Sequence, residues 1–132
     1  PDIAAKLEDH YRETEGQIAR LDEILSSLAE DQSSLKDMAL SFTGAMAALG
    51  HTMAGDEILK NSLANFAFEN FEIAAYKSLI TIAELGGYQS LVAPLWANLD
   101  EEVAMATWLE DNLRPTTIKF ARLKEAGATA KV

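Results

Sequence analysis

Residues 7–28 read LEDHYRETEGQIARLDEILSSL. Seven side chains in this stretch, most of them apolar, recur at alternating intervals of four and three residues: Leu7, Tyr11, Thr14, Ile18, Leu21, Leu25 and Leu28. Residues at these intervals share one face of an α-helix, because a helical turn takes about 3.6 residues. The stretch therefore predicts a long amphipathic helix over about residues 2–29, and with it an all-α fold.

A second and a third helix are expected downstream of the first. Ser33 or Ser34 can cap the second helix, which ends near Gly50. The third helix runs from about Asp56 to about Leu85, where two consecutive glycines end it. Short connections between successive helices favour antiparallel packing in a bundle.

A fourth helix carries the same alternating spacing from Val92 to Leu113, with Pro94 near its start. Arg114-Pro115 is expected to break this helix, because proline lacks a backbone N–H and clashes with the preceding turn. Residues 116–126 then form a short C-terminal helix. No segment alternates with period two for long, so the sequence predicts no sheet.

Length and charge divide the 132 residues into a helical bundle over residues 1–113 and a basic, partly helical tail over residues 114–132. The bundle carries 20 acidic and 6 basic side chains, whereas the tail carries five basic side chains and one acidic one. An acidic body repels nucleic-acid phosphates, so the tail is expected to lie on the bundle of its own chain or of a partner subunit. No apolar run is long enough to cross a membrane.

The chain has no cysteine and two histidines, His10 and His51. These counts exclude thiolate zinc sites, iron–sulfur clusters and cysteine nucleophiles, and they exclude a site built from many histidines. His51 is expected in a loop. The sequence also lacks a phosphate-binding loop and a nucleophile elbow, so nothing in it indicates a hydrolase or a transferase.

Acidic side chains interrupt the apolar faces of the third and fourth helices. Glu69 and Glu72 project from the apolar side of the third helix, and Glu102 lies in the middle of the apolar seam of the fourth. Buried carboxylates are costly unless they are paired, protonated or bound to a cation, and helical bundles use inward carboxylates to hold iron or manganese. The sequence thus predicts a metal site with these three ligands. Three further candidate residues come from the first helix: His10, Glu13 and Gln17. The alternative is that each acid reaches water or pairs with a neighbouring group.

Several motifs resemble those of the YciF/YciE-type ferritin-like proteins. His10–Leu21 resembles the family pattern H-L-x-E-T-x-G-Q-I-x-R-L, and Glu69–Leu79 resembles E-H-Y-E-I-A-x-Y-G-T-L. Leu85–Tyr88 and Leu99–Glu102 resemble its L-G-Y and L-x-E-E segments. The resemblance implies a ferritin-like bundle that is usually dimeric, bacterial and cytoplasmic, that is linked to stress responses and that has a di-metal centre.

The chain also departs from the family pattern. Family members begin with a further long helix that carries a Y-x-A-E motif, and this chain starts after that point. The family's M-E-G segment reads Met38-Ala39-Leu40 here, and its E-H-Y-E reads Glu69-Asn70-Phe71-Glu72. A later acidic position is Ala106. The remaining groups could hold one ion, or two if another chain or segment completes the site.

Two functions follow as hypotheses. The first is a ferritin-like stress-response protein with a carboxylate-rich iron or manganese site; any activity would be oxidation of ferrous iron or chemistry on peroxide. The second is a structural or assembly protein that keeps the bundle and has lost the metal chemistry. In either case, an apolar stripe left without its covering helix favours a homodimer or a higher homo-oligomer.

Overall fold

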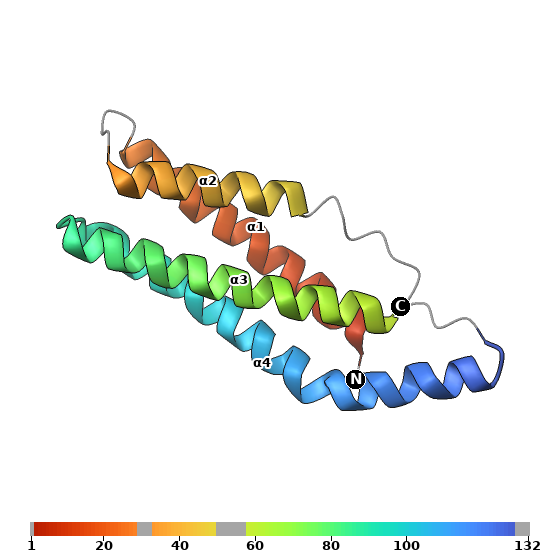
Figure 1. Cartoon of the computed structure of the whole chain (residues 1–132). Coiled ribbons are helices and arrows are strands. Elements are labelled where there is room, and N and C mark those ends of the chain that lie inside the picture. The colour runs from red at the N-terminus through yellow and green to blue at the C-terminus, as the bar shows by residue number, and fades with distance from the viewer. Residues whose placement is uncertain (1, 29–32, 50–57, 129–132) are drawn as a thin grey trace.

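The computed structural model describes residues 2–28, 33–49 and 58–128, and these residues form an all-helical bundle without strands. Its helices are α1 (Ile3–Ser27), α2 (Ser34–Leu49), α3 (Ile58–Leu85) and α4 (Gln89–Glu125). Figure 1 shows successive helices running in opposite directions. The helix backbones approach one another most closely in the order α1–α2–α3–α4 and back to α1, and α3 and α4 form the most extensive pair. The all-α prediction is therefore confirmed.

Local sequence explains where the helices begin and end. The Asp2 carboxylate accepts a hydrogen bond from the backbone N–H of Ala5 at 3.1 Å and caps α1, and the Ser33 hydroxyl accepts one from the N–H of Lys36 at 3.3 Å at the start of α2. After α3, Gly87 adopts a φ of +78°, and the N–H of Tyr88 returns to the carbonyl of Ala83 at 2.8 Å. Glycine adopts this left-handed conformation without strain, so the chain reverses here. The expected boundaries at Gly50 and Asp56 lie outside the described residues.

The structure differs from the sequence prediction at Arg114-Pro115. The fourth helix does not end there but continues through Pro115 to Glu125, so no separate C-terminal helix forms. Pro115 removes one backbone donor, and the axis of α4 changes direction in this region (Figure 1). Tertiary packing supports the extension: Phe120 and Leu123 pack on Ile3 and Ile58 at the starts of α1 and α3. This part of the basic tail therefore lies on the bundle of its own chain.

The inward face of α1 is rotated from the predicted apolar seam. Tyr11, a member of that seam, is 61% exposed, whereas the neighbouring His10 is only 9% exposed. The residues that face inward repeat mainly at seven-residue intervals and include two polar ones: Ile3, His10, Gln17, Leu21, Ile24 and Leu28. The apolar pattern misplaced the face in part because Gln17, a polar residue, occupies a fully buried position on it.

Two apolar clusters lie on either side of a polar layer. The main core contains Leu21, Leu79, Leu95 and Leu99, and an end cluster is centred on Ile3 and Ile58. Six of the buried polar residues of α1, α3 and α4 lie near the boundary between these clusters. We call these six the polar layer: His10, Gln17, Glu69, Glu72, Asn98 and Glu102. None of the helices in the described part of the chain is long and apolar enough to cross a membrane.

The main core predicts a clear contrast between two leucines of α3. Leu79 is fully buried and Leu85 is 84% exposed. We expect Leu79→Ala to lower the free energy of unfolding by ~2–5 kcal/mol, because it removes buried apolar surface and leaves a cavity. The matched control, Leu85→Ala, should change it by no more than about 0.5 kcal/mol. Urea unfolding followed by circular dichroism measures both, and equal effects would contradict this core assignment.

Candidate metal centre

Acidic side chains from two helices meet a histidine from a third inside the bundle. Glu69 and Glu72 of α3 are each 2% exposed, and Glu102 of α4 is fully buried. One nitrogen of His10 and one carboxylate oxygen from each of Glu69 and Glu102 lie within 4.8 Å of one another. The expected convergence of the acids is therefore present in the structure.

Both ring nitrogens of His10 face carboxylates. Nε2 lies 3.1 Å from Oε1 of Glu69, and Nδ1 lies 3.0 Å from Oε2 of Glu13. Burial lowers the pKa of His10, but the hydrogen bonds and negative charges of these neighbours outweigh it and raise the pKa to about 9. Without a metal ion, His10 is thus an imidazolium that donates to both carboxylates.

Glu72 and Glu102 hold protons to unusually high pH. Burial, followed by a hydrogen bond with Glu102 and the charge of that group, raises the pKa of Glu72 to about 9. Burial also raises the pKa of Glu102; the adjacent Glu69 adds to this effect, and hydrogen bonds with Glu72 and with the amide of Gln17 oppose it. Protons on His10 and on these acids therefore neutralise the cluster in the metal-free protein.

Two carboxylate oxygens in the cluster remain unsatisfied. Oε2 of Glu69 and Oε2 of Glu102 are buried, and no N–H or hydroxyl group of the described residues donates to either. A buried polar atom without a partner is costly, and such atoms in native structures usually have a reason, such as an ion. One carboxylate oxygen from each of Glu69 and Glu102, together with one ring nitrogen of His10, forms a set of donors that suits a divalent cation.

A second group of polar side chains supports Glu102. The amide nitrogen of Gln17 donates a short hydrogen bond to Oε1 of Glu102, and the hydroxyl of Tyr76 donates to Oε1 of Gln17 at 2.8 Å. Asn98 donates to the Tyr76 oxygen at 3.1 Å. Burial is the first cause of a raised Tyr76 pKa, so this hydroxyl stays protonated. Gln17 thus presents a donor, not an oxygen, to the cluster.

The predicted site residues fall into three groups. His10, Glu69 and Glu102 form the inner set, and Glu72 lies beside it. Glu13 contacts the set through His10 and keeps 37% of its side chain exposed. Gln17 reaches the site through Glu102. His51 lies outside the described residues.

Sequence reasoning missed two residues that are hydrogen-bonded to this group. Asn98 lies one turn before Glu102 on α4, and Arg20 lies one turn after Gln17 on α1. Their spacing from the predicted residues was the available signal, because residues three or four apart share a helix face. Asn98 was overlooked because polar residues in helices are usually exposed.

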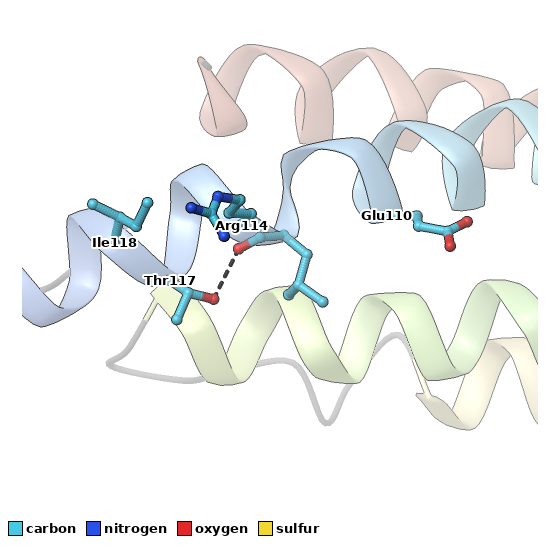
Figure 2. A pocket seen from close by; sticks show the side chains of 5 residues that line it. Glu110, Arg114, Thr117 and Ile118 are labelled. Atoms are coloured by element: carbon cyan, nitrogen blue, oxygen red, sulfur yellow. Dashed lines mark hydrogen bonds between the residues drawn. The ribbon is translucent and has the colours of Figure 1, made fainter.

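A shallow hollow along the last turns of α4 offers no comparable site. It is lined by Glu110, Leu113, Arg114, Thr117 and Ile118. Figure 2 shows Glu110 set apart from Arg114, and the Thr117 hydroxyl donating to the carbonyl of Leu113, a bond of 2.8 Å. The polar groups here do not converge, so the buried cluster is the metal-site candidate.

Comparisons with known proteins agree with this arrangement. The model of a family described as a domain of unknown function, DUF892, matches residues 1–122. The chain is 32% identical over 110 residues to protein YciF of Escherichia coli strain K12. This match covers 77% of the chain and 64% of the length of YciF. No solved structure matches the chain.

The pKa shifts predict how stability depends on pH in the metal-free protein. Glu72 has an ordinary pKa of 4.5 that folding raises to about 9, and His10 has one of 6.5 that folding also raises to about 9. Between these values, the folded state binds more protons than the unfolded state, so the free energy of unfolding falls as pH rises. We expect this decline from just above pH 4.5 to about pH 9 in urea unfolding with a chelator present. Glu72→Gln, which cannot titrate, should make it shallower; a flat or rising wild-type profile would contradict the assignment.

Proposed function

This chain belongs to the DUF892 family of YciF-type proteins, and we propose that its bundle binds a divalent iron or manganese ion between His10, Glu69 and Glu102. The observation that carries the proposal is the pair of buried, unsatisfied carboxylate oxygens on Glu69 and Glu102. Glu69 and Glu102 lie on different helices, and one carboxylate oxygen of each lies within 4.8 Å of one nitrogen of His10. A cation between them would remove the energetic penalty of both oxygens at once.

The charges of the inner set support a divalent ion. Two ionised carboxylates and a neutral imidazole balance a charge of two, so the filled site would be neutral in a low-dielectric interior. Oxygen ligands with one imidazole nitrogen suit iron and manganese, whereas the site has no thiolate to favour softer ions. When the ion binds, His10 and Glu102 must release the protons that they hold in its absence.

Glu13 and Glu72 have supporting roles in this proposal. Glu13 accepts from Nδ1 of His10 at 3.0 Å, and this bond turns Nε2 toward Glu69. A histidine that ligates a metal usually donates its other N–H to such a carboxylate, which fixes the ring. Glu72 contacts Glu102 and is available as a further oxygen ligand after it loses its proton.

We propose one ion per chain. Ferritin-like sites with two ions take about six carboxylate and histidine side chains from four helices. Three helices of this chain supply four such groups: His10, Glu69, Glu72 and Glu102.

A bound iron or manganese ion would supply redox chemistry toward ferrous iron or peroxide. The ferritin-like, cytoplasmic and stress-related parts of the proposal rest on the family resemblance alone. A structural protein without metal chemistry is the alternative, and metal content separates the two.

Self-association is a further part of the proposal. Trp96 and Val103 lie two turns apart on α4 and are 46% and 42% exposed. Large apolar side chains at this spacing form an exposed stripe, and burial against a second copy would remove that stripe from water. We propose that α4 contributes to a homo-oligomer through this face.

Metal binding is tested with Mn²⁺, which is stable in air. Isothermal titration of the full chain, stripped of metal, should give about one site per chain, with proton uptake by the buffer. Glu69→Gln and Glu102→Gln should each weaken binding at least about tenfold, because each removes a charged ligand. The matched control, Glu110→Gln, changes an exposed acid of α4 and should bind as wild type.

The same titration can overturn the proposal. If the wild-type chain binds neither Mn²⁺ nor Fe²⁺ under anaerobic conditions, the metal-binding proposal is wrong, and a structural protein without metal chemistry becomes the better description. Equal binding by the two glutamine variants and the control would move the ion away from this cluster.

Sedimentation velocity tests the α4 face. We expect the wild type to sediment as a dimer or a larger species, and Trp96→Gln with Val103→Gln to reduce its mass, because the apolar stripe is lost. The control is Leu85→Gln, an exposed leucine outside the stripe. A monomeric wild type would refute self-association.

A further inference from the structure

A chain of directed hydrogen bonds runs from the edge of the bundle to the metal-site candidate. It begins at Arg20 of α1, whose Nη1 contacts both carboxylate oxygens of Glu101, at 2.9 and 3.0 Å. The same nitrogen donates to Oδ1 of Asn98 at 2.7 Å. A guanidinium group can only donate, so whatever oxygen lies against it must be an acceptor. Arg20 therefore fixes which end of the Asn98 amide faces it.

Asn98 passes this direction on. Since its oxygen faces Arg20, its NH₂ group faces the other way and donates to the Tyr76 oxygen at 3.1 Å and to the backbone carbonyl of Gln17 at 3.4 Å. The side chain is fully buried. If the amide were turned over, its NH₂ group would face the guanidinium of Arg20. Two hydrogen-bond donors would then face each other, with no acceptor between them. The orientation of Asn98 is thus determined by its surroundings.

Tyr76 transmits the direction to Gln17. The hydroxyl has one hydrogen, and with Asn98 donating to its oxygen, that hydrogen goes to Oε1 of Gln17. The Gln17 oxygen is then occupied, and its NH₂ group points at Oε1 of Glu102. The aromatic ring of Tyr76 is held independently, by an edge-on contact with Phe42 at 4.8 Å between ring centroids.

We infer that Arg20, Asn98 and Tyr76 are positioning residues that make Gln17 a hydrogen-bond donor to Glu102 rather than a metal ligand. The relay restrains one oxygen of Glu102 and leaves Oε2, which has no partner among the described residues, for the ion. This inference rests on the proposed metal site, and it removes Gln17 from the ligands expected from the sequence. It also explains why two helices carry buried amides beside a carboxylate cluster.

Two variants break the relay at different points. Tyr76→Phe removes the hydroxyl hydrogen but keeps the ring against Phe42. Asn98→Asp keeps the size of the side chain and the oxygen that accepts from Arg20. It replaces the NH₂ group that donates to Tyr76 with a second oxygen, which can only accept when the acid is ionised. The Tyr76 hydrogen then turns to residue 98, and Oε1 of Gln17 loses its donor. Tyr11→Phe is the control, because it removes a hydroxyl from a tyrosine that is 61% exposed.

The first measurement follows the relay without metal. In a ¹H–¹⁵N spectrum of the metal-free chain, the side-chain NH₂ signals of Gln17, assigned by their loss in Gln17→Glu, should be shifted downfield and protected from exchange with water. Both Tyr76→Phe and Asn98→Asp should move these signals and remove their protection, whereas Tyr11→Phe should leave them in place. Unchanged Gln17 signals in both relay variants would overturn the relay. A variant that does not fold is recognised by its whole spectrum, and the other variant then decides.

The second measurement is Mn²⁺ titration of the same proteins. Loss of a hydrogen bond that orients a metal ligand typically weakens binding about 10- to 100-fold, and we expect this loss for Tyr76→Phe, with the control unchanged. Relay variants that lose the Gln17 signals yet bind Mn²⁺ within about twofold of wild type would overturn the positioning role and leave the metal site standing. A wild type that binds no ion would overturn the metal site itself, while the Gln17 signals would still report on the relay.

Discussion

The structure depends on how the bundle neutralises acidic side chains in its interior. Glu69, Glu72 and Glu102 are almost completely buried, and a low-dielectric interior does not tolerate three unpaired negative charges. In the metal-free chain, the imidazolium of His10 and the protons on Glu72 and Glu102 provide the compensation. A divalent ion would provide it more directly and would also satisfy the two oxygens that no described donor reaches.

The sequence predicted the helices well where local chemistry decides them. Seam spacing, the Ser33 cap and the Gly86-Gly87 turn are properties of short segments, and they predicted the all-α fold, both ends of α1 and the end of α3 to within a few residues. The prediction was wrong at Arg114-Pro115, where packing of Phe120 and Leu123 on the end cluster outweighs the missing backbone donor. Tertiary contacts of this kind are not visible in a local pattern.

The candidate site was predictable in part for a similar reason. Glu69, Glu72 and Glu102 stood out because acids on apolar helix faces conflict with the pattern around them. Asn98 and Arg20 did not stand out, since their roles depend on a partner almost 80 residues away in the chain. Which nitrogen or oxygen of an amide faces a neighbour is a property of the assembled layer alone. The sequence can therefore predict which residues are near the site. It cannot predict whether an amide such as that of Gln17 presents its oxygen, as a metal ligand, or its NH₂ group, as a hydrogen-bond donor.

The rotated face of α1 has a consequence for access. Its middle turns meet α3 and α4 through His10, Gln17 and Arg20, which are hydrogen-bonded side chains rather than a continuous apolar seam. Water can replace such bonds during a brief local opening, whereas separating α3 from α4 would expose much more of the main core. An ion or a small molecule would then reach the buried carboxylates where α1 separates from α3 and α4. Amide hydrogen exchange in residues 8–20 would be faster than in the α3–α4 hairpin. His10 and Gln17 would thus both shape the metal-site candidate and, through their hydrogen bonds, limit access to it.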